Sequence, residues 1–182
     1  MQYRRLGLTD LRVSILGIGT GGPSLFGQSS GVSESDVTAM VHRGLDLGIN
    51  FFDTSPQYRD SEARLGRVLA SVARDDIVVA TKFAPVRDGV VVAPDDVVQS
   101  VESSLRLLRV EQLDLLQFHG LLQPHCGEVL DRLWPTVAAL RERGRCRWVG
   151  VTESYKDDPA HGMLERVLHR PPFDTAMVGY NL

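Results

Sequence analysis

Short apolar runs alternate with stretches of helical apolar spacing along nearly the whole chain, and no other feature of the sequence limits the fold so strongly. Some runs, such as Ile77-Val78-Val79-Ala80, are continuously apolar, as in parallel strands that are buried on both faces. Strict alternation of this kind predicts a parallel sheet with right-handed crossovers. The expected strands cover residues 15–19, 50–52, 77–80, 113–118, 147–151 and 175–180.

Two parallel architectures fit this alternation, a barrel and a doubly wound sheet. The Gly-x-Gly-x-x-Gly match at residues 17–22 runs into a loop and does not open a helix, which argues against the doubly wound dinucleotide fold. Residues 2–14 alternate with period two around a turn and predict a hairpin that closes the bottom of a barrel. A complete barrel of this type has eight strands. We therefore expect residues 1–182 to form one α/β domain, a TIM-type barrel that is incomplete on its C-terminal side.

Polar side chains recur at the carboxyl ends of the expected strands, where such a barrel binds its ligands. We expect Asp53 to pair with Lys82 and keep it charged, and the ammonium of Lys82 to lower the pKa of Tyr58. A phenol with a lowered pKa is a usable general acid near neutral pH. The residues selected by position are Thr20, Asp53, Lys82, His119, Thr152 and Glu153, together with Tyr58 in the loop after Asp53.

Each of these residues also has an ordinary structural explanation. An aspartate at a strand end is usually a turn former, a single lysine is usually solvated, and a single histidine is usually hydrogen-bonded within the structure. Their joint placement at one end of the sheet favours a catalytic group. A metal site built from His119, His125 and Cys126 is not expected, because no second pair of ligands accompanies them.

The sequence resembles the aldo-keto reductase family along the whole chain. The resemblance rests on motifs that are weak alone and specific together. They are Tyr3-Arg4-Arg5-Leu6-Gly7, Leu16-Gly17-Ile18-Gly19-Thr20-Gly21, Leu47-Gly48-Ile49-Asn50-Phe51-Phe52-Asp53-Thr54, Ser61-Glu62-Ala63-Arg64-Leu65-Gly66, Ala80-Thr81-Lys82-Phe83, Leu113-Asp114-Leu115-Leu116-Gln117-Phe118-His119 and Trp148-Val149-Gly150-Val151. The loop Gly21-Gly22-Pro23-Ser24-Leu25-Phe26-Gly27 favours the branch typified by L-galactose dehydrogenase.

This resemblance implies an eight-stranded barrel and hydride transfer between NADP(H), or alternatively NAD(H), and a small carbonyl, sugar or polyol. It implies a catalytic tetrad in which Tyr58 protonates the carbonyl oxygen, with Asp53, Lys82 and His119 beside it. It also implies cofactor contacts from Gly19, Thr20, Gly21, Asp53, Thr152 and Glu153.

The chain departs from the family pattern where the nicotinamide carboxamide is held. The family usually has Ser-Asn after the fifth strand and Gln in the sixth, whereas this chain has Thr152, Glu153 and Met177. An ionised glutamate accepts hydrogen bonds but cannot donate them, and methionine is only a weak acceptor. Two alternatives therefore stay open: an inactive barrel fragment or pseudoenzyme that acts as a binding or regulatory partner, and lyase or isomerase chemistry that uses Tyr58 and Lys82 without a cofactor.

Composition limits the remaining function classes. A net charge of −3 gives no electrostatic reason for a nucleic-acid or membrane partner, and no apolar run is long enough to span a bilayer. Two cysteines without a framework pattern, and an N-terminus without the apolar core of a secretory signal, predict a reduced, cytoplasmic protein. An open barrel has unpaired strand edges, so self-association through those edges is also expected.

Overall fold

The computed structural model describes residues 1–168 and 173–179. Its centre is a sheet of six parallel strands in the order β10-β9-β8-β5-β4-β3. The strands are β3 (Ile18–Gly19), β4 (Phe51–Asp53), β5 (Val78–Phe83), β8 (Leu113–Leu121), β9 (Cys146–Glu153) and β10 (Thr175–Met177). The strand order follows the chain order, so each crossover leads to the adjacent strand, as in a β/α barrel. The predicted parallel sheet is confirmed.

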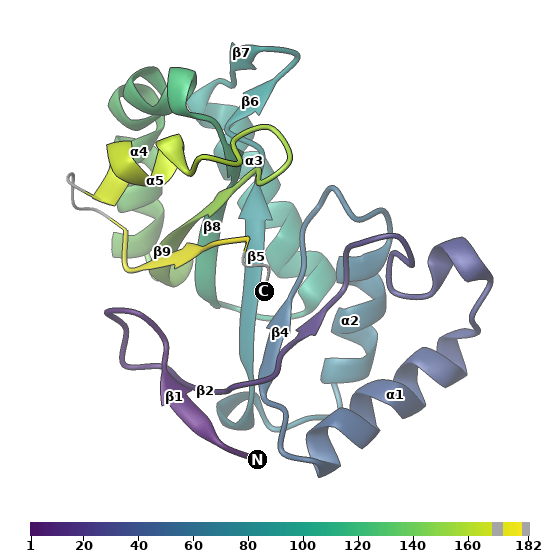
Figure 1. The fold of residues 1–182 in the computed structure, drawn as a ribbon. Coiled ribbons are helices and arrows are strands. Elements are labelled where there is room, and N and C mark those ends of the chain that lie inside the picture. The colour runs from purple at the N-terminus through teal and green to yellow at the C-terminus, as the bar shows by residue number, and fades with distance from the viewer. Residues whose placement is uncertain (169–172, 180–182) are drawn as a thin grey trace.

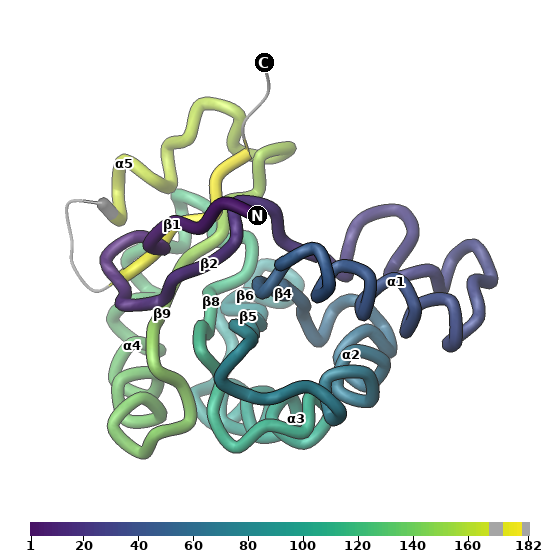
Figure 2. The backbone as a smooth tube through the Cα atoms, turned by 90° about the horizontal axis from the view of Figure 1, so that it is seen from below, coloured from purple at the N-terminus to yellow at the C-terminus, as the bar shows by residue number. Residues whose placement is uncertain are grey.

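Helices join the strands and cover one side of the sheet (Figure 1). They are α1 (Glu34–Asp46), α2 (Ser61–Leu69), α3 (Pro94–Leu108), α4 (Cys126–Glu142) and α5 (Gly162–Leu168), with short 3₁₀ turns at Gln28–Ser30, Arg74–Asp76 and Gln123–His125. Seen from below, α2, α3 and α4 lie along the outside of a curved row of strands (Figure 2). The fold is thus an incomplete β/α barrel.

Local sequence signals explain where most helices begin and end. Ser33 caps α1 by accepting a hydrogen bond from the Asp36 amide, and Gly48, with φ +87°, follows the end of that helix. Pro94 opens α3 at the position where its missing N–H costs nothing. Gly66 lets α2 approach α3 closely, because a Cβ there would lie 2.1 Å from the Leu107 carbonyl oxygen. α2 and α3 are therefore packed tightly against one another.

The predicted N-terminal hairpin is present. β1 (Tyr3–Arg5) pairs antiparallel with β2 (Arg12–Ser14), and Leu11 and Val13 pack with Val78 near the start of β5. The hairpin therefore lies at the amino ends of the strands, as expected for a plug. A second hairpin, β6 (Val86–Arg87) with β7 (Val90–Val91), follows β5 and was not predicted.

Several boundaries differ from the sequence prediction. Ile15 and Leu16 are 56% and 60% exposed and precede β3, which begins only at Ile18. α4 runs unbroken from Cys126 to Glu142, although Pro135 lies inside it. The last expected strand ends at Met177, and its predicted end at Tyr180 lies outside the described residues. Within the described residues, no helix is long and apolar enough to cross a membrane.

Candidate active site

The candidate site lies at the carboxyl end of three neighbouring strands. Asp53 is the last residue of β4, Lys82 lies near the end of β5, and His119 lies in the last third of β8. Because β4, β5 and β8 are adjacent and parallel, their ends meet at one edge of the sheet. Tyr58 reaches the same place from the loop between β4 and α2. The structure therefore brings together four of the seven residues that were selected by position.

Asp53 and Lys82 form a buried ion pair at the centre of this group. The Lys82 ammonium donates to Asp53 Oδ2 and to the Thr54 carbonyl oxygen, the latter at 2.8 Å, and its side chain is 1% exposed. The Gln117 amide donates to the other carboxylate oxygen of Asp53 at 3.0 Å. Burial lowers the pKa of Lys82, and the Asp53 carboxylate opposes that shift. The expected pairing of Asp53 with Lys82 is confirmed.

Tyr58 and His119 face one another beside this pair. The phenol oxygen lies 3.4 Å from His119 Nε2, and Nδ1 lies 3.1 Å from Ser55 Oγ. Burial and the neighbouring Lys82 lower the pKa of His119 to about 4, so its imidazole is neutral at pH 7. A neutral imidazole donates from one nitrogen and accepts at the other. His119 is thus held between a hydroxyl on each side.

The pKa of Tyr58 corrects the sequence prediction. The Lys82 ammonium lies over the ring, 5.1 Å from its centroid, and was expected to lower the phenol pKa. Instead, burial and the negative charge of Asp53 raise the pKa of Tyr58 to about 12. Asp53 pairs directly with Lys82 and offsets its charge, so the cation does not overcome the cost of removing water from a phenolate. Tyr58 is accordingly a protonated phenol at neutral pH.

Sequence analysis missed several polar groups of the site. Gln117 could have been found, because strand alternation places it on the same side of β8 as His119. Ser55 gave no signal beyond its place in the loop. Glu62 of α2 is 1% exposed and accepts from the Thr81 hydroxyl at 2.6 Å, directly behind Lys82. Burial raises the pKa of this carboxyl.

The expected cofactor residues fall into two groups. At the Gly19 position a Cβ would meet nothing within 4 Å, and Gly21 lies against the Tyr58 ring. The Thr20 side chain, in contrast, is fully buried and donates to the Thr54 hydroxyl at 2.7 Å. Gly19 thus leaves open space beside the strand ends, whereas the Tyr58 ring fills the space at Gly21 and Thr20 has its partner within the chain.

The polar side chains at the carboxyl end of β9 also have their hydrogen-bond partners within the chain. Thr152 Oγ1 accepts from the Gly120 amide at 2.8 Å. Glu153 Oε2 lies 2.8 Å from His161 Nδ1, and Oε1 accepts from the Gly179 amide beyond β10. The Glu153 side chain is 1% exposed, whereas Met177 is 38% exposed. Glu153 thus ties three segments together, while its predicted role in cofactor binding stays a prediction.

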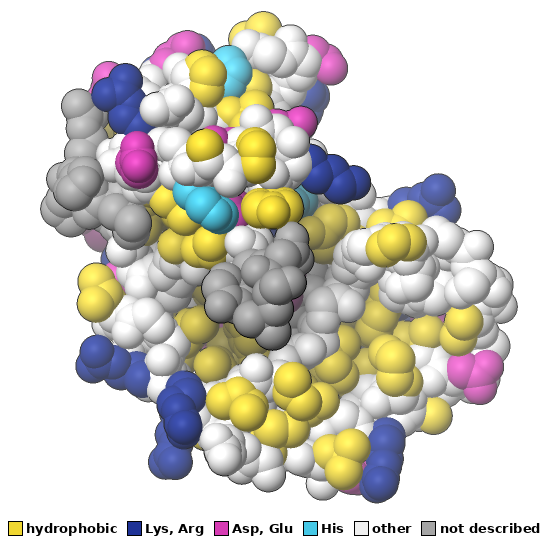
Figure 3. Space-filling view, in the orientation of Figure 1, with side chains coloured by type: hydrophobic (Ala, Val, Ile, Leu, Met, Phe, Trp, Pro, Cys, Tyr) yellow, Lys and Arg dark blue, Asp and Glu magenta, His cyan; other side chains and the backbone are white. Residues whose placement is uncertain are grey.

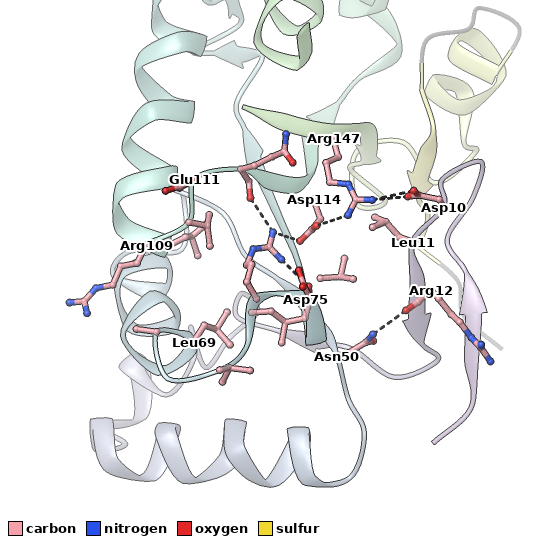
Figure 4. A pocket seen from close by; sticks show the side chains of 18 residues that line it. Asp10, Leu11, Arg12, Asn50, Leu69, Asp75, Arg109, Glu111, Asp114 and Arg147 are labelled. Atoms are coloured by element: carbon pink, nitrogen blue, oxygen red, sulfur yellow. Dashed lines mark hydrogen bonds and ion pairs between the residues drawn. The ribbon is translucent and has the colours of Figure 1, made fainter. Parts of the chain in front are cut away.

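A separate cavity of about 780 Å³ lies at the opposite, amino end of the strands (Figure 4). Asp114, 3% exposed, accepts there from Arg74 at 2.6 Å and from the Val79 amide at 2.8 Å, with Arg147 at 3.5 Å. Arg147 also pairs with Asp10 of the hairpin at 3.1 Å. Arg12 and Arg109 extend away from the cavity (Figure 4). These ion pairs join the hairpin to β8 and β9, far along the sheet from Tyr58.

Comparison with known proteins gives a consistent set of similarities. The model of the aldo/keto reductase family matches residues 17–179. L-galactose dehydrogenase of Arabidopsis thaliana is 35% identical over 84% of the chain and 48% of its own length. The NADH-specific methylglyoxal reductase of Escherichia coli is 28% identical over 80% of the chain and 50% of its own length.

The structural comparison points the same way. A protein of Pseudomonas aeruginosa, solved as an aldo-keto reductase, superposes with a TM-score of 0.78 and 33% identity, covering 99% of this chain and 68% of that one. The chain spans about half the length of the curated relatives it matches.

Proposed function

The chain belongs to the aldo/keto reductase family, and we propose that it takes part in reducing small carbonyl compounds, or oxidising the matching alcohols, with a nicotinamide cofactor. The cluster of Asp53, Tyr58, Lys82 and His119 at one end of the sheet carries this proposal. It places a protonated phenol, a buried ammonium and a neutral imidazole next to one another. Such a set suits proton transfer to a carbonyl oxygen.

Tyr58 is the proton donor in this proposal. Its raised pKa, about 12, keeps the phenol protonated at pH 7, so it meets a carbonyl in its acid form. His119 Nε2, 3.4 Å from the phenol oxygen, orients the hydroxyl and the substrate oxygen. Lys82 supplies positive charge near the phenolate that forms when Tyr58 gives up its proton, and Asp53 holds Lys82 in place. Burial of this group strengthens each of these interactions.

The residues near the tetrad fit a nicotinamide only in part. Open space at Gly19 would admit a flat ring beside the strand ends, and the Thr152 hydroxyl hydrogen is free to donate to a carboxamide oxygen. Glu153 offers no free group, because both of its oxygens already accept hydrogen bonds. When bound, the cofactor supplies the hydride that the carbonyl carbon receives. We propose NADP(H) as this cofactor, with NAD(H) as the alternative that the methylglyoxal reductase relative supports.

The substrate class is proposed from the same relatives. One of them is named for L-galactose and another for methylglyoxal, both small polar carbonyl compounds. We therefore propose a short hydroxy- or oxo-aldehyde or sugar as substrate. Two buried, free cysteines, Cys126 and Cys146, support a reducing compartment such as the cytoplasm.

A cofactor titration and a reduction assay test this proposal. NADPH and NADH are each titrated into the protein while cofactor fluorescence is followed, and a panel of aldehydes and aldoses is then assayed through loss of nicotinamide absorbance. Binding of either cofactor with reduction of at least one short aldehyde supports the proposal. If neither cofactor binds at millimolar concentration, this chain is not itself a reductase.

The engagement of Glu153 favours a second candidate, a barrel that binds a partner without hydride transfer. A Glu153→Asn variant separates the two, because asparagine has both a donor and an acceptor for a carboxamide. Cofactor affinity that appears only in the variant identifies Glu153 as the cause of lost reductase function. Affinity already present in the parent chain, and lost in the variant, contradicts this second candidate.

Self-association through the sheet edges is also proposed. Among residues 1–168 and 173–179, β3 and β10 each pair with a single strand. Unpaired strand edges favour addition of another strand. Large hydrophobic side chains such as Leu8 and Leu16 are exposed, and Figure 3 shows hydrophobic side chains gathered in the middle of the face turned to the viewer. Light scattering after gel filtration tests this proposal, and a stable monomer at all concentrations contradicts it.

A further inference from the structure

Gln28 anchors the segment between β3 and α1 to the loop that carries Tyr58. Its side-chain amide donates to the Leu25 carbonyl at 2.7 Å and to the Tyr58 carbonyl at 3.2 Å. The same nitrogen lies 3.0 Å from Ser61 Oγ, and the amide oxygen accepts from the Asp60 amide at 3.1 Å. One half-buried side chain therefore bonds the backbone of Tyr58 and both residues at the start of α2.

Gly21 contacts Tyr58 from the same segment. A Cβ at position 21 would lie 2.7 Å from two carbons of the Tyr58 ring, and its three nearest neighbours all belong to that ring. No other atoms limit the space at this position so closely. The absence of a side chain at Gly21 is therefore what lets the phenol ring settle against the strand end.

Tyr58 depends on such contacts more than its neighbours do. Asp53, Lys82 and His119 stand on strands of the sheet, whereas Tyr58 lies in a loop whose next residue, Arg59, has a left-handed φ of +52°. The hydrogen bond between its hydroxyl and His119 is long, at 3.4 Å. A displacement of about 1 Å can cost two orders of magnitude in rate. The position of the phenol therefore rests on what holds this loop.

We propose that Gln28 is a positioning residue for Tyr58. Its amide holds the carbonyl of Tyr58 and the backbone that follows the tyrosine, and Gly21 sets how far the ring can approach β3. Gln28 touches no reacting atom and acts only through Tyr58. The kinetic part of this inference rests on the proposed reductase function, whereas the structural part concerns the loop alone.

Three variants separate the contributions of Gln28 and Gly21 to the position of Tyr58. Gln28→Ala removes all four bonds. Gln28→Glu keeps an acceptor for the Asp60 amide but loses the donor to the Tyr58 carbonyl. Gly21→Ala leaves Gln28 unchanged and places a methyl group against the Tyr58 ring. The matched controls are Ser30→Ala, in the same exposed turn, and Gly127→Ala, where a Cβ meets nothing within 4 Å.

We expect kcat to fall about 10- to 100-fold in the three variants, as for a displaced catalytic group. In the two Gln28 variants, KM for the cofactor should change less than threefold, about 0.6 kcal/mol. The Ser30 and Gly127 controls should retain parental kcat. Because a loss of folded protein would also lower apparent kcat and leave KM unchanged, kcat is calculated per folded molecule, with the folded fraction measured by circular dichroism.

The titration of His119 by NMR gives a second readout that needs no activity. Tyr58 and Lys82 face this imidazole, and its pKa is about 4 because it is buried. A loosened Tyr58 admits water, so the pKa should rise towards its ordinary value in Gln28→Ala and Gln28→Glu, with His119→Gln used to assign the signal. If the parent reduces no carbonyl, the proposed function fails while this titration still tests Gln28.

An active parent, with parental kcat and an unchanged His119 titration in both Gln28 variants, overturns the inference alone. Should Gln28→Ala fail to fold by circular dichroism, Gln28→Glu and Gly21→Ala decide the matter by the same two readouts.

Discussion

The two ends of one sheet each hold a carboxylate paired with cations, and they differ in what surrounds the pair. At the carboxyl end, Asp53 pairs with Lys82, and a phenol and an imidazole stand beside them. At the amino end, Asp114 pairs with Arg74 and Arg147, and its remaining partner is the Val79 amide.

Only the carboxyl end of the sheet holds groups that suit proton transfer. Arginine stays protonated at any pH that a folded protein meets, and a backbone amide does not titrate, so the Asp114 group can only bind and orient. Lysine, tyrosine and histidine all have pKa values that surroundings can move, and here burial moves all three. Similar ion pairs thus hold segments together at one end of the strands and, at the other, lie beside groups that can transfer protons.

The largest expected effect comes from removing the phenol hydroxyl. Tyr58→Phe should lower kcat for carbonyl reduction by about 10²- to 10⁴-fold, because general acid catalysis contributes roughly that much. Thermal unfolding should stay close to parental, since the hydrogen bond of this hydroxyl to His119 is long and no other is seen within residues 1–168 and 173–179. Tyr3→Phe is the matched control: it removes a 2.8 Å hydrogen bond to the Gly48 carbonyl at the other end of the sheet. Parental kcat in Tyr58→Phe would show that the Tyr58 hydroxyl is not the proton donor.

The next effect is a pH dependence of stability at the carboxyl end. His119 has a pKa of about 4 in the folded chain and near 6.5 when exposed. Between pH 4 and 6.5, His119 therefore binds a proton in the unfolded chain and stays neutral in the folded chain. Stability from this group should be complete above pH 6.5 and fall by about 2–3 kcal/mol as the pH drops to 4.

Denaturant unfolding at a series of pH values measures this loss. His119→Gln should lack the part of the pH dependence that lies between pH 4 and 6.5. Because other carboxyl groups titrate nearby, the difference between the parent and this variant is the quantity to compare. An identical pH dependence in both proteins would show that His119 is not shielded from water.

At the amino end the expected effect is on stability alone. Asp114→Ala leaves the buried Val79 amide without its acceptor, which should cost about 1–3 kcal/mol of unfolding free energy. Arg74 and Arg147 are both partly exposed and can turn to water, so they add little to this cost. Asp75→Ala, an exposed carboxylate on the rim of the same cavity, should stay within about 0.5 kcal/mol of the parent. Altered kcat per folded molecule in Asp114→Ala would contradict the separation of the two ends.

Sequence reasoning found the strand-end residues because alternation fixes where strands end. Asp53, Lys82 and His119 follow apolar runs, and parallel strands bring such ends together. Tyr58 came from its position after Asp53 and from family resemblance. The strand from residue 15 was predicted too long, because apolar residues such as Ile15 and Leu16 can stay exposed and the pattern does not say so.

What the sequence could not supply depends on distances between segments far apart in the chain. The pKa of Tyr58 was predicted in the wrong direction, because burial and the offset of Lys82 by Asp53 are properties of the packed site. The bonds of Glu153 with His161 and Gly179 depend on a loop and on the end of β10. Gln28 gave no signal, because an amide in a variable loop has no pattern of its own.

The smallest expected effect tests whether arginine is needed at the amino end. Arg74 donates to the Ile77 and Gln112 carbonyls at 2.9 and 3.0 Å as well as to Asp114. The single nitrogen of a lysine cannot span three acceptors held by a planar fork, so Arg74→Lys should cost about 0.5–1.5 kcal/mol. Arg109→Lys, whose side chain extends away from the cavity, is the control (Figure 4). Arg74→Lys keeps the positive charge. A loss of stability with an unchanged His119 titration would therefore come from the lost geometry of the guanidinium. A shifted His119 titration would instead show that the two ends of the sheet are coupled through β5 and β8.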